Sequence, residues 1–428
     1  MRAARIHSAL IVFLVSYAVL TVLGNLLYFS SIGDIVGWYS IHDFSISKFT
    51  TAGSAGYWAL LLLPFAIVPP VAMLVGTVLR PILSPVAARL PAPSLPEYLL
   101  LLLACHAYVA ASLWRANAIG LMFGGASFVM SSQARLDLFS AIGFWPQVVL
   151  KSVLFALTCY GFVRALMGGG PRWIAVSAFN LIAMSIALAL LNMKWPLVLL
   201  YCAHMVALWL LVRRSLVLPT VAFALLAGAG YVAVTFLVLH AVVIPSANGL
   251  DHPAIHKSDA AGIAASALLN RMAQPYPYYF ETFTLSPGKC GTLLTRIRRK
   301  PSPCQPSNLV YAEMFSDAFA GVGTAPQPPH VTGYALNGWP GALVEIVLTA
   351  IVLGLFAAMA GAATAEQATL TVIGALTGYH FSQLPFEGPL VYDHGLLWLI
   401  PLLLAVMGAH AIRTRRSALP SLAKAGGE

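Results

Sequence analysis

Hydrophobic residues along this chain form long runs interrupted by short polar segments, and they do not alternate with polar positions. About 20 apolar residues are enough to cross the hydrocarbon core of a bilayer as a helix. We therefore predict an all-α polytopic membrane protein with about ten transmembrane helices, within a range of 10–12. The predicted spans are 8–30, 55–79, 97–118, 146–167, 173–191, 196–212, 217–241, 336–360, 368–384 and 395–412.

Two segments depart from this pattern. Residues 119–145 are half apolar and rich in glycine, which is typical of an interfacial or re-entrant stretch that lines a cavity or is buried in protein. Residues 242–335 mix aromatics, histidine and proline, and we expect a long, ordered extracytoplasmic loop with short helices. The predicted organisation is thus 1–241 with helices one to seven, the loop 242–335, and 336–428 with helices eight to ten and a cytoplasmic tail.

The N-terminal sequence MRAARIHSALIVFLVSYAVL resembles a signal peptide. Its apolar stretch is longer than the usual 7–15 residues, and no clear cleavage site follows, so we expect an uncleaved first span. Only 9% of the residues are charged, whereas a soluble domain carries about 25%. The net charge of +10 could indicate nucleic acid, but no basic block with nucleic-acid-reading aromatics is present, and we expect no nucleic-acid partner.

The distribution of cations predicts the orientation, because lysine and arginine collect at cytoplasmic helix ends. With both termini inside, 12 cations lie at cytoplasmic ends and 5 outside, leaving the long loop aside. The inner set is Arg2, Arg5, Arg80, Arg89, Arg164, Arg172, Arg213, Arg214, Arg413, Arg415, Arg416 and Lys424, and the outer set is Lys48, Arg115, Arg135, Lys151 and Lys194. Ten of the 14 acidic residues fall outside, which reflects either the site of chemistry or simply longer outer loops.

The five cysteines divide into two groups. Cys105, Cys159 and Cys202 lie in predicted spans, where cysteine usually packs as a small apolar residue. Cys290 and Cys304 flank GTLLTRIRRKPSP in the outer loop. In an oxidising compartment they could close this loop as a disulfide, although the sequence does not establish that they pair.

Charged side chains at membrane depth are costly and are therefore candidates for function. Arg135, Lys194 and Arg271 lie at outer positions, and their convergence in one cavity would suit phosphate, which arginine binds in a bidentate manner. Each could instead be a solvated or snorkelling side chain. The sequence lacks His-x-x-x-His, Cys-x-x-Cys and Asp-x-Asp patterns, and we expect neither a metal nor a cofactor.

Acid–base candidates are Glu281, Glu313, Asp137, His330 and His380, and each could equally be an ordinary polar residue. His330 lies in GVGTAPQPPHVTGYALNGWPG, where prolines and glycines allow a rigid turn that approaches a ligand closely. A second stretch, NRMAQPYPYYFETF at 270–283, joins Arg271 and Glu281 to several rings. Tyr276, Tyr278 and Tyr279 could present flat faces to sugars while their hydroxyls form hydrogen bonds.

The segment EMFSDAFAGVGTAPQPPHVTGYALNGWPGALVEIVL resembles the last part of Wzy-type oligosaccharide repeat-unit polymerases, and NRMAQPYPYYFETF resembles the arginine-plus-aromatic part of their outer loop. The hairpin at Lys194 and an arginine after the third span fit as well. The resemblance covers roughly 190–345. It departs from the Arg-x10-Gly pattern of some members, because position 282 is Thr282.

The resemblance implies a glycosyltransferase of the bacterial inner membrane whose active site faces the periplasm. Its donor and acceptor would be undecaprenyl-pyrophosphate-linked oligosaccharides, polymerised into O-antigen, capsule or exopolysaccharide beside a flippase and a chain-length regulator. Arg135, Lys194 and Arg271 would stabilise the leaving pyrophosphate, and Glu281, His330 or Asp137 would act in proton transfer.

Three alternatives stay open at this stage. An O-antigen ligase would transfer finished glycan to lipid A core or to a protein, and it shares the same lipid and outer loop. A flippase or transporter would place charges along a path through both leaflets, whereas here they collect near the outer side. A non-enzymatic component of an assembly complex would need no convergent cations.

Overall fold

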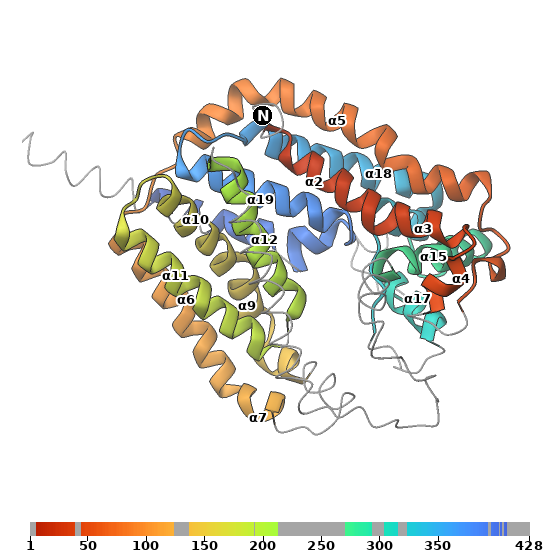
Figure 1. The fold of residues 1–428 in the computed structure, drawn as a ribbon, viewed down its shortest axis with the longest axis horizontal. Coiled ribbons are helices and arrows are strands. Elements are labelled where there is room, and N and C mark those ends of the chain that lie inside the picture. The colour runs from red at the N-terminus through yellow and green to blue at the C-terminus, as the bar shows by residue number, and fades with distance from the viewer. Residues whose placement is uncertain are drawn as a thin grey trace, which may run out of the picture. The chain divides into compact units, whose positions relative to one another are not determined.

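The computed structural model describes residues 6–38, 44–123, 137–191, 193–212, 270–292, 304–315, 323–392, 395–401, 403–404 and 406–408. Every regular element in these ranges is a helix (Figure 1). Seven of the described helices are long and apolar enough to cross a membrane, and a further apolar helix, Trp195–Leu211, is shorter. The chain thus has the helical architecture of a polytopic membrane protein.

The observed helices match the predicted spans closely, because long apolar runs dictate them. The seven are Ser8–Tyr28, Ala55–Ala88, Leu95–Arg115, Phe144–Leu166, Pro171–Leu190, Pro329–Met359 and Gly388–Gly408. The predicted spans 196–212 and 368–384 correspond to the shorter helices α12 (Lys194–Leu211) and α19 (Ala365–Phe381). The predicted span 217–241 lies outside the described residues, so the expected number of ten stays a prediction.

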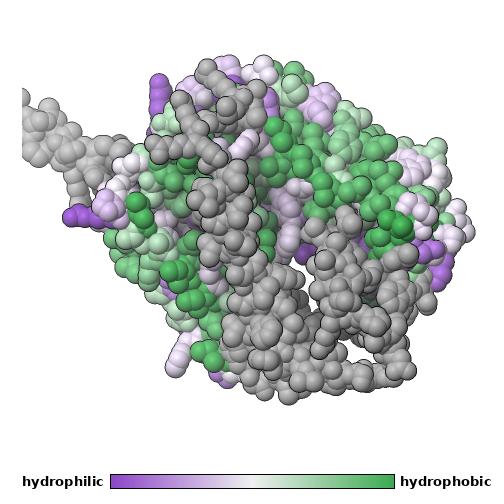
Figure 2. Space-filling view, viewed as in Figure 1, coloured by the Kyte–Doolittle hydropathy of each residue, from purple (hydrophilic) through white to green (hydrophobic). Residues whose placement is uncertain are grey.

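Exposed apolar side chains cover wide areas of the described surface (Figure 2). On α5 (Ala55–Ala88), Leu74, Val78 and Ile82 recur every four residues and are 64%, 60% and 63% exposed. Residues four apart lie on one face of a helix, so this face of α5 is an apolar stripe. Such a stripe is stable against lipid tails and would be costly in water.

The chain forms two compact units that cut across the three sequence segments predicted above. Unit 1 comprises Met1–Leu83, Asp251–Ala358 and Gly374–Pro389, and unit 2 comprises Ser84–Leu250, Met359–Ile373 and Leu390–Glu428. The described residues of the predicted outer loop therefore belong to the same unit as the first two spans and α18 (Pro329–Met359).

In unit 1, the first span consists of α2 (Ser8–Tyr17), a π-helical turn (Ala18–Val22) and α3 (Leu23–Tyr28). It runs beside α5 and α18 (Figure 1). The Tyr17 hydroxyl donates a hydrogen bond to the Leu61 carbonyl at 2.8 Å. Short helices α4 (Gly33–Trp38), α15 (Pro275–Leu285) and α17 (Pro306–Phe315) gather where the first span ends and α5 begins.

The first span and α5 are antiparallel. His7, at the start of α2, is close to Arg80 near the end of α5: burial lowers the pKa of His7 most, and the charge of Arg80 lowers it further. At the opposite end, the Tyr57 hydroxyl of α5 donates to Asn25 Oδ1 of α3. The basic end of this helix pair is therefore the end away from α15 and α17.

Unit 2 contains α6 (Leu95–Arg115), α7 (Ala118–Phe123), α9 (Phe144–Val148), a π-helical turn (Val149–Leu154), α10 (Phe155–Leu166), α11 (Pro171–Leu190) and α12. A polar network joins three of these helices. His106 Nε2 is 2.7 Å from Asn180 Oδ1, and Asn180 Nδ2 donates to the Thr158 hydroxyl at 2.9 Å. Paired polar groups of this kind fix the packing of helices in an apolar environment.

Candidate functional site

Helix α15 closes one end of the helix pair in unit 1, and its tyrosines serve as anchors. The Tyr276 hydroxyl donates to the Tyr57 carbonyl at 2.7 Å, and the Tyr279 hydroxyl donates to the Ala325 carbonyl at 3.1 Å. The two side chains are 0% and 1% exposed, and burial raises the pKa of Tyr276 well above its usual value. The structure thus departs from the expectation that Tyr276 and Tyr279 face sugars, because both rings are packed inside protein.

Tyr278 has a different environment. It is partly buried, and its ring lies 4.7 Å from that of Phe49 and 6.4 Å from that of Phe44, measured between centroids. These rings belong to the loop that precedes α5. Of the three predicted glycan-binding tyrosines, Tyr278 is the one whose side chain retains some exposure, so it stays a candidate for contact with a sugar.

Arg271 is exposed on a backbone that is otherwise buried. Residues 270 and 272–277 on either side of it are all buried. Asn270 accepts a hydrogen bond from the Tyr28 hydroxyl at 2.7 Å and donates one to the Val36 carbonyl at 2.7 Å. A guanidinium held on such a scaffold needs little reorganisation to bind an anion.

The carbonyls after Arg271 are also fixed by side chains from distant segments. Asn25 Nδ2 donates to the Ala273 carbonyl at 3.3 Å, and Gln327 Nε2 donates to the Met272 carbonyl at 2.8 Å. Asn25 and Gln327 are themselves wholly buried. Neither was among the predicted site residues, although a polar asparagine inside an apolar span was a sequence signal that could have drawn attention to Asn25.

The Glu281 carboxylate is hydrogen-bonded to the loop before α5. Its oxygens accept hydrogen bonds from the backbone N–H groups of Thr50 at 3.1 Å and Thr51 at 2.8 Å, and from both threonine hydroxyls. Burial acts to raise the pKa of Glu281, but the hydrogen bonds from Thr51 and Thr50 outweigh it and the net pKa is lowered. A carboxylate with four donors and a lowered pKa is a weak base, so the geometry argues against this predicted role.

The second half of the loop is joined to α15 by a disulfide and by polar contacts. Cys290 and Cys304 form a disulfide with a Cα–Cα distance of 4.7 Å, the pairing that the sequence left open. Glu313 of α17 accepts a hydrogen bond from the Thr282 hydroxyl and lies 3.5 Å from Lys289 Nζ. Helix α17 is thereby tied to α15, and Glu313 has a structural partner on each side.

His330 lies inside unit 1 and not on a surface turn. Residues 329–336, expected to form an outer turn, are the wholly buried first turns of α18. His330 Nε2 is 3.1 Å from the Tyr17 hydroxyl, and its Nδ1 has no hydrogen-bond partner among the described residues. Its ring also meets that of Tyr17 edge-on at 5.3 Å. In this position His330 cannot reach a sugar outside the protein.

A break interrupts α18 directly after this buried segment. Asn337 and Gly338 have non-helical backbone angles, and Gly338 has a φ of +62° that favours glycine. The two halves of α18 approach each other closely at Gly333 and Gly341. A Cβ added at Gly333 would lie 2.4 Å from the Gly341 carbonyl oxygen. The glycines of YALNGWPG are therefore required by backbone geometry within a helix, whereas the sequence predicted a rigid turn that approaches a ligand.

The remaining predicted residues lie away from α15 in the sequence: two belong to unit 2, one belongs to unit 1 and one lies outside the described ranges. Asp137 is exposed, and Lys194 is the first residue of α12. Arg135 lies outside the described residues. Lys194 and Arg271 belong to different units, so their convergence with Arg135 stays a prediction. His380, a further acid–base candidate, is buried in α19.

Comparison of the chain with family models, with curated proteins and with solved structures found no match. Within the described ranges, no group of three or more His, Cys, Asp or Glu side chains is placed to hold a metal ion. The residues themselves therefore carry the functional argument. The candidate site is the end of unit 1 covered by α15, with Arg271 as its exposed cation.

Proposed function

We propose that the protein is an inner-membrane glycosyltransferase that polymerises undecaprenyl-pyrophosphate-linked oligosaccharide repeat units at the periplasmic face. The observation that carries the proposal is Arg271, an exposed cation on a buried backbone that is fixed by hydrogen bonds. The partly exposed Tyr278 follows it seven residues later in the same stretch. A pyrophosphate needs a preorganised cation, and a sugar needs an aromatic surface. The likeness of 270–283 to the loop of Wzy-type polymerases gives the substrate class.

The arrangement of charges in unit 1 supports this orientation. Arg80 and His7 lie together at one end of the first two spans, and α15 and α17 lie at the other. Cations favour the cytoplasmic end of a membrane helix, and this rule supports a periplasmic position for the end covered by α15. The Cys290–Cys304 disulfide is consistent with that side, because disulfides persist in an oxidising compartment.

The chemistry follows from the proposed substrates. The acceptor sugar hydroxyl attacks the anomeric carbon of the donor glycan, a C–O bond forms there, and the bond to undecaprenyl pyrophosphate breaks. Arg271 stabilises the negative charge that collects on the leaving pyrophosphate. A contribution from Lys194 and Arg135 stays a prediction from the sequence. Among the predicted acid–base residues, Glu281 accepts four hydrogen bonds, His330 is buried and Asp137 is exposed. Asp137 belongs to unit 2, so its role as the base stays a prediction.

Substitution of Arg271 tests the proposal. Purified Arg271→Ala protein, given a defined lipid-linked repeat unit, should form the product ladder about 10²–10³ times more slowly, the usual cost of removing one charge-stabilising group. Arg271→Lys should keep part of the activity, because lysine supplies charge without the bidentate geometry. The exposed position of Arg271 means that both variants should unfold at the wild-type temperature.

Lys289→Ala is the matched control, because it removes a cation of the same loop that pairs with Glu313 at 3.5 Å. It should leave the ladder intact. Wild-type ladder formation by Arg271→Ala would refute the proposed role of this residue. A single transfer to lipid A core by the wild-type protein would instead identify a ligase, and movement of the lipid without any new glycosidic bond would identify a transporter.

A further inference from the structure

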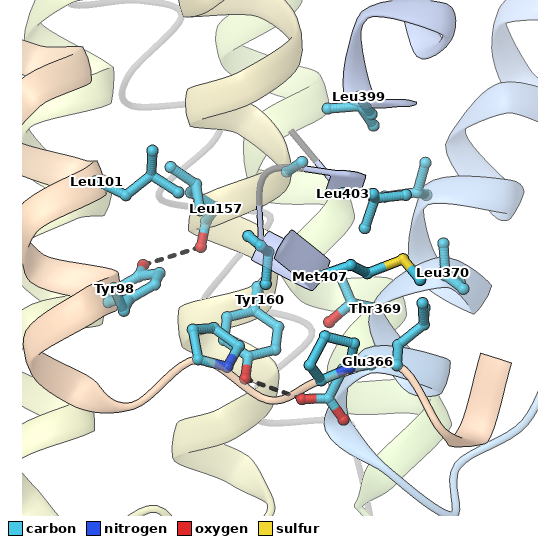
Figure 3. A pocket seen from close by; sticks show the side chains of 16 residues that line it. Tyr98, Leu101, Leu157, Tyr160, Glu366, Thr369, Leu370, Leu399, Leu403 and Met407 are labelled. Atoms are coloured by element: carbon cyan, nitrogen blue, oxygen red, sulfur yellow. Dashed lines mark hydrogen bonds between the residues drawn. The ribbon is translucent and has the colours of Figure 1, made fainter. Parts of the chain in front are cut away.

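Unit 2 contains an apolar pocket between its helices, separate from the residues used above (Figure 3). Its cavity volume is about 130 Å³. Aliphatic side chains line most of it, from α6, α10, α19 and the C-terminal helical segment; examples are Leu101, Leu157, Leu370 and Leu403. A slot of this composition within a membrane protein fits a hydrocarbon chain.

One end of the pocket is polar. Tyr160 and Glu366 lie together there, at the lower end in Figure 3, and the Tyr160 hydroxyl donates to Glu366 Oε1 at 2.9 Å. At this end α10 terminates and α19 begins, so Glu366 is in the first turn of its helix. The start of α6 contributes Tyr98, whose hydroxyl donates to the Leu157 carbonyl at 2.9 Å. Helix ends mark the boundary of a membrane, where a lipid headgroup would lie.

Arg164 lies near this polar end, next to the lining residue Tyr160. It follows Tyr160 by one helical turn, and its charge acts on the Tyr160 hydroxyl. The guanidinium carbon lies 5.4 Å from the centre of the Trp173 ring, which is 5.0 Å from the ring of Tyr98. The Arg164 Nε atom is buried and has no hydrogen-bond partner among the described residues. A buried donor left in this state is an open position for an acceptor from a ligand.

Two more arginines are sequence neighbours of residues at this end of the pocket. Arg89 directly precedes Leu90, which lines the pocket, and Arg172 directly precedes Trp173. Both side chains are exposed. The sequence pattern assigns Arg89, Arg164 and Arg172 to cytoplasmic helix ends, where anionic lipids attract basic residues.

Two acidic residues lie at the same end, and both are already satisfied within the protein. Glu366 accepts the bond from Tyr160, and Glu97 Oε2 accepts bonds of 2.7 Å from both the N–H and the hydroxyl of Ser94. The helix ends that carry this part of the pocket therefore bring three arginines and two engaged carboxylates, which leaves net positive charge. The balance favours a negatively charged headgroup over one that carries an ammonium group.

We propose that this pocket binds one anionic glycerophospholipid, with an acyl chain in the apolar slot and its phosphate on Arg164. Arginine suits this role because its planar group bonds two phosphate oxygens at once. The lipid would fill the cavity, supply the acceptor that Arg164 Nε lacks, and hold α6, α10 and α19 together. This inference does not rest on the proposed glycosyltransferase activity.

The test measures which lipid the protein retains. Full-length protein is purified, mixed with equal amounts of phosphatidylglycerol and phosphatidylcholine, and examined by native mass spectrometry. The wild type should retain phosphatidylglycerol over phosphatidylcholine by about fivefold or more, and Arg164→Gln should lower this preference by about fivefold, the usual effect of one basic residue. Leu101→Trp should abolish retention of both lipids, because the indole fills the slot.

Matched substitutions outside the pocket complete the design. Leu100 is the neighbour of Leu101 on α6 and is 73% exposed, so Leu100→Trp should retain lipid as the wild type does. Arg115→Gln, at the far end of α6, should keep the headgroup preference. Equal retention by Leu101→Trp and Leu100→Trp would overturn the proposed slot. A wild type without preference, or an Arg164→Gln protein identical to Arg115→Gln, would overturn the proposed headgroup site.

Discussion

The residues of the stretch 270–283 in unit 1 differ in burial, and burial distinguishes those that stabilise the fold from those that can contact a ligand. Within 270–283, Tyr276 and Tyr279 point into protein, whereas Arg271 is exposed and Tyr278 is partly so. Helical periodicity places successive side chains on different faces, so adjacent residues of similar type need not share a role. The sequence identified the stretch, but the direction of each side chain depends on where α15 packs.

Glu281→Gln should destabilise the protein but leave its proposed transferase activity unchanged. The charged acceptor of four hydrogen bonds is lost, which should lower the free energy of unfolding by roughly 1–2 kcal/mol at pH 7. Because the folded-state pKa is lowered, the carboxylate stabilises the fold above the unfolded pKa of about 4.3, and this contribution is lost as the pH falls through the folded pKa. Thermal unfolding at pH 7 and in acid measures both effects.

Glu313→Gln is the comparison, since that carboxylate forms a surface ion pair, and its effect should be smaller. The difference between wild type and Glu281→Gln should shrink below about pH 4. A Glu281→Gln protein that loses ladder formation while its unfolding midpoint stays unchanged would restore Glu281 as a catalytic base.

Helix α18 shows how an element can differ from its sequence pattern. Its apolar second half was predicted as a span from residue 336, whereas the structure adds the buried turns from Pro329 and a break at Asn337 and Gly338. Proline and glycine predicted an irregular segment correctly. They could not predict its burial, because burial depends on Tyr17, which lies 313 residues away in sequence.

Gly333→Ala should disturb this break directly. The new methyl group would meet the Gly341 carbonyl oxygen at 2.4 Å, which a backbone atom cannot avoid without movement of the helix. Overpacking of this kind costs about 1–3 kcal/mol. Thermal unfolding in detergent should show the loss, and Gly408→Ala, which adds its methyl group in open space, should leave the midpoint unchanged. Equal midpoints for the two variants would argue against a close crossing in the membrane-bound protein.

At the scale of the whole molecule, the sequence predicted the helical class and most spans because lipid imposes simple rules of length and composition. It could not predict which helices pack into which unit. That assignment rests on side-chain contacts between distant segments, such as the bond from Tyr276 to Tyr57, 219 residues apart in sequence. The candidate cations could be named because the charge of a residue can be read from the sequence. Whether these cations lie close together could not be predicted, because it depends on the packing of distant helices.

The proposed orientation can be measured on α5, whose 34 residues separate Lys48 before it from Arg89 after it. In a protein without Cys105, Cys159 and Cys202, Lys48→Cys should react with a membrane-impermeant thiol reagent added to intact spheroplasts. Arg89→Cys should react only after permeabilisation, because it is expected on the cytoplasmic side. The reverse labelling would place α15 and Arg271 in the cytoplasm and exclude the periplasmic reaction.

The bonds that join the residues before α15 to the first span also set an order for biogenesis. Asn25 and Tyr28 find their partners at Ala273 and Asn270, which are 248 and 242 residues later in the chain. A ribosome that adds about 5–20 residues per second needs roughly 10 to 50 s to reach them. During that interval the nascent first span holds polar groups without their final acceptors, so it should stay bound to the insertion machinery until the loop is translocated.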